Sequence, residues 1–178
     1  INLIDVKYDQ KKAFEKKSKK SNKYIEDCFL LAFNILKSKI TNKFINGPIY
    51  KNKFLKKKYL GVTEYISDYF SVKKNAMLIY NKKLSVCPVT THLPLKNVSK
   101  KINKKLIGEK IELINEFYKK NIGYNPKIGV LGLNPHCESI DKYNEDEKII
   151  KPVISNLKKK INVSGPYSAD TAFLKKNR

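Results

Sequence analysis

One stretch of the chain constrains the fold more than any other. Residues 127–133, Lys-Ile-Gly-Val-Leu-Gly-Leu, form a nearly continuous apolar run. A strand that is apolar on both faces is typical of a parallel sheet, because helices cover such a sheet on both sides. The polar turn Asn134-Pro135-His136 follows at once. We therefore predict a buried strand at 127–133 whose exit carries an ionisable side chain.

Helical patterns occur on both sides of this strand. Apolar residues recur at helical spacing between Ile25 and Ile40, after a start signal at Ser21 or Asn22. A second helix is predicted from about 98 to 120. The carboxylates of 145–147 suit the first turn of a third helix, because negative charge is favourable at a helix N-terminus.

Shorter apolar segments predict further strands, at 1–6, 43–46, 77–80 and 84–89. A turn at 81–83 would join the last two. Strands that alternate with long helices indicate an α/β fold with a mixed, largely parallel sheet flanked by helices. In such folds ligands bind beyond the carboxyl ends of the strands.

The composition is that of a folded domain. The chain has 178 residues, of which 41% are hydrophobic, enough for one domain with a core. It starts at Ile1 and stops at Arg178 without a terminating signal, so we expect a fragment of a longer protein. No apolar run approaches the ~20 residues of a membrane span. Three cysteines without C-x-x-C spacing favour a reducing cytoplasm over a disulfide framework or a thiolate zinc site.

The formal net charge of +22 raises the question of nucleic-acid binding. Two observations argue against it. Arg178 is the only arginine among 38 basic residues, although arginine is the residue that reads bases and clamps phosphates in a bidentate way. The lysines are scattered along the chain and form no single stripe. We therefore favour coding bias of an AT-rich genome as the source of the charge, and keep a basic nucleic-acid-binding module as the alternative from a different class.

The candidate site residues lie at strand exits. The chain has only two histidines, His92 and His136, and each follows a strand-like run. Imidazole is the commonest protein metal ligand, so the two could share one ion. Taken singly, each histidine is more often a hydrogen-bonded turn residue than a ligand. Asp170 would equally suit a role in bracing its turn, and Lys51 a solvated surface position.

Several motifs, in their order and spacing, resemble one enzyme family. Residues 90–95 (Thr-Thr-His-Leu-Pro-Leu), 132–136 (Gly-Leu-Asn-Pro-His) and 165–171 (Gly-Pro-Tyr-Ser-Ala-Asp-Thr) are similar to motifs of the 4-hydroxythreonine-4-phosphate dehydrogenases of vitamin B6 biosynthesis. Residues 47–51 and 61–64 fit the upstream motifs of that family. Together the motifs span nearly the whole chain. The resemblance makes residues 1–178 the central portion of a longer dehydrogenase-like chain that lacks both ends here.

The resemblance implies a fold and a metal site. The fold would be like that of isocitrate and isopropylmalate dehydrogenases, with the site in a cleft between two subdomains. A divalent metal (Zn, Mg or Co) would be held by three histidines, of which the first two match His92 and His136. The third would come from a later segment, across a homodimer interface. Thr63 matches a substrate contact, and Asp170 and Lys51 match residues that we expect to be catalytic.

The resemblance also implies an activity. This is the metal-dependent, NAD- or NADP-linked oxidation and decarboxylation of 4-phosphooxy-threonine, a small phosphorylated substrate, with the fragment expected to be inactive alone. The sequence departs from the family in two places. Val62 stands where a histidine is common, which keeps open a related dehydrogenase that acts on another phosphorylated sugar acid. Residues 137–141 replace the usual glycine-rich continuation after the Asn-Pro-His turn.

Overall fold

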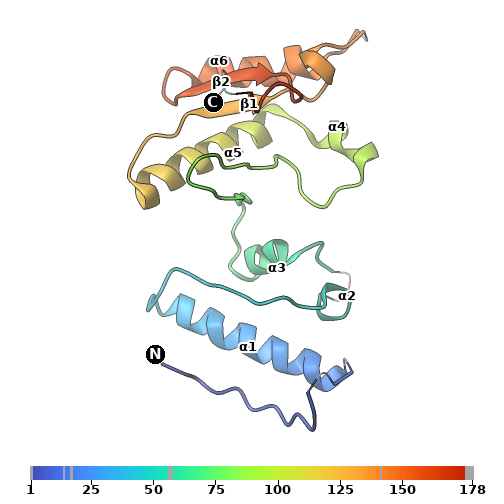
Figure 1. Cartoon of the computed structure of the whole chain (residues 1–178), viewed down its shortest axis with the longest axis vertical. Coiled ribbons are helices and arrows are strands. Elements are labelled where there is room, and N and C mark those ends of the chain that lie inside the picture. Colours follow the sequence, from blue (N-terminus) through green and yellow to red (C-terminus); the bar gives the residue numbers. More distant parts are fainter. Residues whose placement is uncertain (1, 14, 17, 56–57, 141, 175–178) are drawn as a thin grey trace. The chain divides into compact units, whose positions relative to one another are not determined.

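Two groups of packed side chains, one in each half of the chain, organise the fold. The computed structural model describes residues 2–13, 15–16, 18–55, 58–140 and 142–174 (Figure 1). The chain divides into an N-terminal unit, Ile1–Asp68, and a C-terminal unit, Tyr69–Arg178. Among the described residues, no helix is both long enough and apolar enough to cross a membrane.

The N-terminal unit contains the helices α1 (Lys19–Lys37), α2 (Lys51–Phe54) and all but the last residue of α3 (Val62–Tyr69). Helix α1 confirms the helix predicted from apolar spacing, but it begins earlier. Ser18 is its N-cap, and the Ser21 amide donates to Ser18 Oγ over 3.1 Å while the Ser18 amide donates to Ser21 Oγ over 2.9 Å. This reciprocal capping box satisfies amides that the first turn leaves without helical partners. Ser21 is thus part of the start signal and already lies inside the helix.

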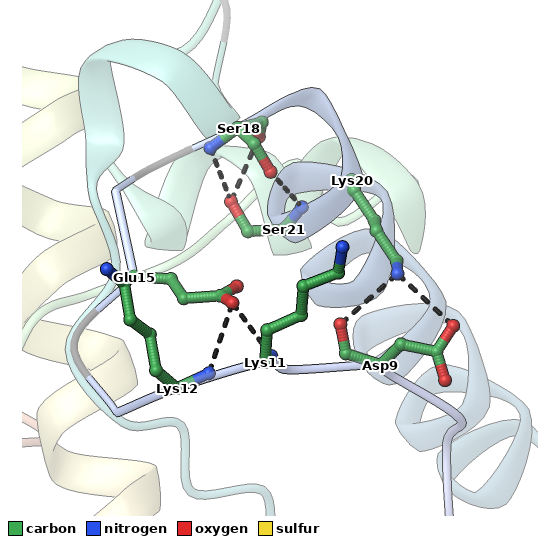
Figure 2. Close-up of polar contacts among 7 residues, drawn as sticks. All are labelled: Asp9, Lys11, Lys12, Glu15, Ser18, Lys20 and Ser21. Atoms are coloured by element: carbon green, nitrogen blue, oxygen red, sulfur yellow. Dashed lines mark hydrogen bonds and ion pairs between the residues drawn. The ribbon is translucent and has the colours of Figure 1, made fainter.

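Polar contacts hold the segment before α1 (Figure 2). Lys20 Nζ lies 3.3 Å from Asp9 Oδ2, and Glu15 Oε1 accepts hydrogen bonds from the amides of Lys11 and Lys12 over 2.7 and 3.3 Å. The strand predicted at 1–6 is wrong for the described residues 2–6, which form no strand. Its apolar side chains bury little, since Leu3 is 90% exposed. Ile1 lies outside the described residues.

Aromatic side chains form the core of the N-terminal unit. Phe29 and Phe33 of α1 are buried, at 4% and 0% exposure. Phe44 packs edge-on against both, with its ring centroid 5.5 Å from Phe29 and 6.1 Å from Phe33. Phe54 of α2 and Tyr65 of α3 pack against Phe29 at 5.2 and 5.6 Å. The strand predicted at 43–46 is therefore also wrong, because its aromatic residue packs on a helix and no ladder forms.

The C-terminal unit has more elements, in the order η1 (Leu95–Asn97), α4 (Val98–Lys101), α5 (Lys104–Phe117), η2 (Tyr118–Ile122), β1 (Ile128–Leu131), η3 (Pro135–Cys137), η4 (Asp146–Ile150), α6 (Lys151–Leu157) and β2 (Val163–Tyr167). The helix predicted over about 98–120 is confirmed for most of its length, but it is not continuous, because it is interrupted at 102–103. Ile102 adopts an extended backbone, and Asn103 Oδ1 accepts from the Leu106 amide over 2.9 Å. Because the Asn103 side chain caps α5, it competes with continuation of α4 through this position.

The strands β1 and β2 form a parallel pair. Ile128 is in register with Val163, and Leu131 with Tyr167, with an irregularity between Gly129 and Leu131. Gly165, at φ +127°, lies against the Val130 carbonyl, where a side chain would collide with the backbone. The predicted parallel arrangement is thus confirmed for this pair, and η4 and α6 lie between the two strands in the chain.

Aliphatic residues of both strands and of the helices form the core of the C-terminal unit: Ile102, Ile107, Ile111, Ile128, Ile150, Val153, Ile154 and Val163. The prediction that both faces of β1 are covered is wrong for the described residues. Ile128 is buried, but Leu131 remains 38% exposed. Burial of apolar surface contributes about 25 cal/mol per Å². This core therefore packs against one face of the strand pair and holds the strand ends that lead into the polar turns.

The strands predicted at 77–80 and 84–89 meet at a single antiparallel bridge. The amides and carbonyls of Ile79 and Val86 exchange hydrogen bonds of 2.8 and 3.0 Å. The predicted turn between them is present, with the Lys83 amide donating to Asn81 Oδ1 over 2.9 Å. The two segments thus run antiparallel on either side of the turn, and they pair at this one bridge without forming an extended ladder.

Candidate active site

The exit of β1 carries His136 in an unusual backbone conformation. His136 has a φ of +55° and Cys137 a φ of +62°, two successive left-handed residues within η3. A non-glycine residue in this region is uncommon and persists where the surrounding structure holds it. The His136 side chain is 73% exposed. The turn thus presents an accessible imidazole directly beyond the sheet edge, as its position after the apolar run predicted.

The parallel pairing of β1 with β2 brings His136 to Asp170. His136 Nδ1 lies 3.8 Å from Asp170 Oδ2. Ser168 Oγ donates to Asp170 Oδ1 over 2.6 Å and lies 3.4 Å from His136 Nδ1. The hydrogen bond from Ser168 lowers the pKa of Asp170, and so, to a smaller degree, does the charge of His136. The carboxylate at this edge is therefore ionised at neutral pH.

His92 lies in the same unit, in the turn between the bridged segments and η1. Its φ is +57°, so both candidate histidines adopt the left-handed conformation. Its side chain is exposed. Imidazoles and a carboxylate are donor types that Zn²⁺ and similar divalent ions accept. Within the described ranges, no group of three or more His, Cys, Asp or Glu side chains gathers into a potential metal site.

The other two candidates belong to the N-terminal unit. Lys51 is the first residue of α2 and Thr63 lies in the first turn of α3, and both are exposed. A cavity of about 560 Å³ in this unit is lined by residues of α1, α2 and α3, which include Lys23 and Tyr65. Neither Lys51 nor Thr63 is among its lining residues. The cavity therefore adds nothing to the site that the motifs suggest.

Sequence reasoning missed Asp146. It treated this residue only as one of the carboxylates of a helix start, yet Asp146 is fully buried. Asp146 Oδ1 accepts from the Leu133 amide over 2.7 Å, and Oδ2 accepts from the Asn134 amide and from Asn134 Nδ2 over 3.1 and 3.0 Å. An acidic residue downstream of an Asn-Pro turn is a weak signal. Only the path of the chain shows that it returns to the turn.

The packing around Asp146 also bears on Cys137. A Cβ on Gly132 would lie 2.6 Å from Cys137 Sγ and 3.0 Å from Asp146 Oδ1, so only glycine fits there. Burial, and then the negative charge of Asp146, raise the pKa of the Cys137 thiol. A nucleophilic cysteine needs the thiolate, which this environment disfavours. The three cysteines, Cys28, Cys87 and Cys137, are free thiols.

Comparison with known proteins points to one family. The family model described as pyridoxal phosphate biosynthetic protein PdxA matches residues 1–178. A protein of a Sulfurihydrogenibium species named 4-hydroxythreonine-4-phosphate dehydrogenase is 35% identical over 178 residues, which cover 97% of this chain and 54% of the relative. A protein of Oceanobacillus iheyensis, named as a candidate D-threonate 4-phosphate dehydrogenase, is 35% identical over 67% of this chain and 37% of its own length.

Solved structures agree with the sequence relatives. The crystal structure of a 4-hydroxythreonine-4-phosphate dehydrogenase from Klebsiella pneumoniae superimposes with a TM-score of 0.76 at 26% identity, over 89% of this chain and 50% of that one. The α/β fold with parallel strands and helices is thus shared with that enzyme. The chain spans about half the length of the curated relative that it matches from end to end.

Proposed function

The chain belongs to the pyridoxal phosphate biosynthetic protein PdxA family, and we propose on that basis that its full-length form oxidises and decarboxylates 4-phosphooxy-threonine, with NAD or NADP and a divalent metal. The observation that carries the proposal is the pairing of His136 with Asp170 at the edge of a parallel sheet, within a chain that matches the family throughout. We also propose an isocitrate dehydrogenase-like arrangement of two subdomains, of which this chain is the central portion.

The residues suit this chemistry. When bound, a divalent cation supplies Lewis-acid stabilisation of negative charge on substrate oxygens, and a nicotinamide accepts the hydride. His92 and His136 would hold the metal through neutral imidazoles. Asp170, held ionised beside His136 Nδ1, favours the tautomer that keeps the proton on Nδ1 and leaves the lone pair of Nε2 for a ligand bond. Ser168 orients that carboxylate through its hydroxyl.

The remaining parts of the proposal concern residues of the N-terminal unit and partners. Thr63 is assigned to the substrate, and Lys51 offers an exposed ammonium that can neutralise an anionic substrate or return a proton after loss of carbon dioxide. We further propose a homodimer in which the partner subunit supplies a third metal ligand, with zinc, magnesium or cobalt as the ion. We propose a cytoplasmic location for the full-length protein.

A second candidate substrate has a specific motivation. Val62 replaces the histidine that the family commonly carries, and one relative is named for D-threonate 4-phosphate. A related dehydrogenase of another phosphorylated sugar acid is therefore the alternative. The basic nucleic-acid-binding module rests only on the net charge of +22, and it predicts affinity that falls with salt by a log-log slope of about −0.9 per phosphate contacted.

The test is an assay of the full-length protein. We expect 4-phosphooxy-threonine, a divalent metal and NAD⁺ or NADP⁺ to give reduced cofactor, and H136A and H92A to lower metal occupancy and turnover with the fold intact. The alternative substrate would be favoured if the wild type turned over D-threonate 4-phosphate but not 4-phosphooxy-threonine, and if V62H gained activity with 4-phosphooxy-threonine. Full metal occupancy in both histidine variants would rule out the proposed site.

A further inference from the structure

Asp146 is a buried charge that the proposed chemistry does not use. Among the described residues it is the only charged residue that is buried, at 0% exposure. Burying a carboxylate is unfavourable unless hydrogen bonds satisfy it. Asp146 therefore needs its partners, and its partners are the residues that lead into the histidine turn.

Three donors of that turn point at the carboxylate. The amides of Leu133 and Asn134 and the side-chain amide of Asn134 all donate to it, over 2.7 to 3.1 Å. Asn134 Nδ2 also donates to Glu145 Oε2 over 3.0 Å. Hydrogen bonds to an ionised acceptor are stronger than those between neutral groups. The start of η4 is thus tied to the exit of β1 by a charge-assisted network.

The network ends where the backbone becomes strained. Asn134 is the last extended residue before η3, and within that short helix His136 and Cys137 adopt positive φ values. Asp146 Oδ1 also lies close to the position of Gly132, beside Cys137 Sγ. The carboxylate therefore contacts the residues that come just before His136 and Cys137 in the chain. Left-handed backbone at non-glycine residues persists only where the surrounding structure holds it in place.

We propose that Asp146 is a positioning residue, whose buried carboxylate holds the 133–137 turn in the conformation that presents His136 beside Asp170. The structural part of this inference stands on the hydrogen bonds alone. Its consequence for metal binding rests on the proposed function.

Matched variants of the full-length protein test the proposal. D146N keeps the size of the side chain but replaces one carboxylate oxygen, an acceptor, by an NH2 group. This donor would face the amide donors of Leu133 and Asn134. E147Q is the control, because it removes the same charge from the same helical turn, where Glu147 is half-exposed and pairs with Lys151. N134A is a milder third variant, because it leaves the carboxylate and both backbone amides in place.

Hydrogen exchange followed by mass spectrometry is the first readout. In D146N we expect exchange of the Leu133 and Asn134 amides to rise about tenfold or more, with a smaller rise in N134A and none in E147Q. Exchange in α5 should stay at the wild-type level in all three variants. Equal exchange at the turn in D146N, N134A and E147Q, or a uniform rise across the C-terminal unit in D146N, would overturn the positioning role.

Zinc affinity, measured by calorimetry, is the second readout. A metal-binding wild type should lose about tenfold or more in affinity in D146N and none in E147Q, as found when groups that orient a metal ligand are removed. Unchanged affinity in a folded D146N would overturn the inference for the metal. A wild type that binds no zinc would count against the proposed function instead, and exchange at the turn would then decide the role of Asp146.

Discussion

The two units of the chain are built on different cores, and the difference shows what each can position. In the N-terminal unit, rings of Phe29, Phe33 and their neighbours pack at centroid distances of 5.2 to 6.1 Å between helices and loops. In the C-terminal unit, an aliphatic core supports a hydrogen-bonded pair of strands. Ring packing fixes a hydrophobic interior, whereas paired strands also align their ends. The latter arrangement brings two candidate site residues, His136 and Asp170, together.

The largest effect should come from the ring core. F33A removes a fully buried phenyl ring and leaves a cavity, so we expect it to lower the free energy of unfolding by about 3–5 kcal/mol. Thermal or denaturant unfolding of the full-length protein measures this, with hydrogen exchange in α1 to localise it. I45A is the matched control, because Ile45 is 95% exposed and its replacement should change stability by no more than about 0.5 kcal/mol. Similar losses in both variants would show that the rings do not form the core.

A smaller effect is expected at the break between α4 and α5 in the C-terminal unit. N103A removes the side chain that caps α5 and should lower the free energy of unfolding by about 0.5–2 kcal/mol. N103D, which also caps, should retain most of the stability. If N103A and N103D are equally destabilised in chemical denaturation, the cap is not what separates the two helices.

The smallest effect concerns a single titration at the strand ends. S168A removes the hydrogen bond that does most to lower the pKa of Asp170, so this pKa should rise toward its ordinary value. A carboxyl whose pKa is lower in the folded state stabilises the fold above its unfolded pKa, and this is lost as the pH falls through the folded pKa. In S168A this stabilisation should be smaller, and its loss should be complete at a higher pH, because the folded pKa lies closer to the unfolded pKa.

An NMR titration of the Asp170 side chain in wild type and S168A measures the shift. S155A, on the exposed side of α6, is the control and should leave the Asp170 titration unchanged. An identical titration of Asp170 in S168A and wild type would mean that Ser168 does not bond the carboxylate in solution, and would weaken the contrast between the units.

Local signals in the sequence predicted the elements that depend on local interactions. Helical spacing found α1, but the predicted start signal at Ser21 or Asn22 lay too far along the chain, because the capping box begins with Ser18 and the helix with Lys19. The apolar run at 127–133 predicted a strand in a parallel pair, and the turn at 81–83 was also found. The strands predicted at 1–6 and 43–46 are wrong for the described residues 2–6 and 43–46, because an apolar segment becomes a strand only where another strand offers hydrogen bonds.

The sequence by itself determined the family of this chain, the alternation of helices with strands and the candidates His92, His136, Asp170, Lys51 and Thr63. Only the tertiary structure decided that His136 lies 3.8 Å from Asp170 and that the buried carboxylate of Asp146 accepts hydrogen bonds from the amides of Leu133 and Asn134. Periodicity, capping and turn chemistry act between near neighbours and can be read along the chain. The contacts of a buried carboxylate join residues that only the folded path brings together.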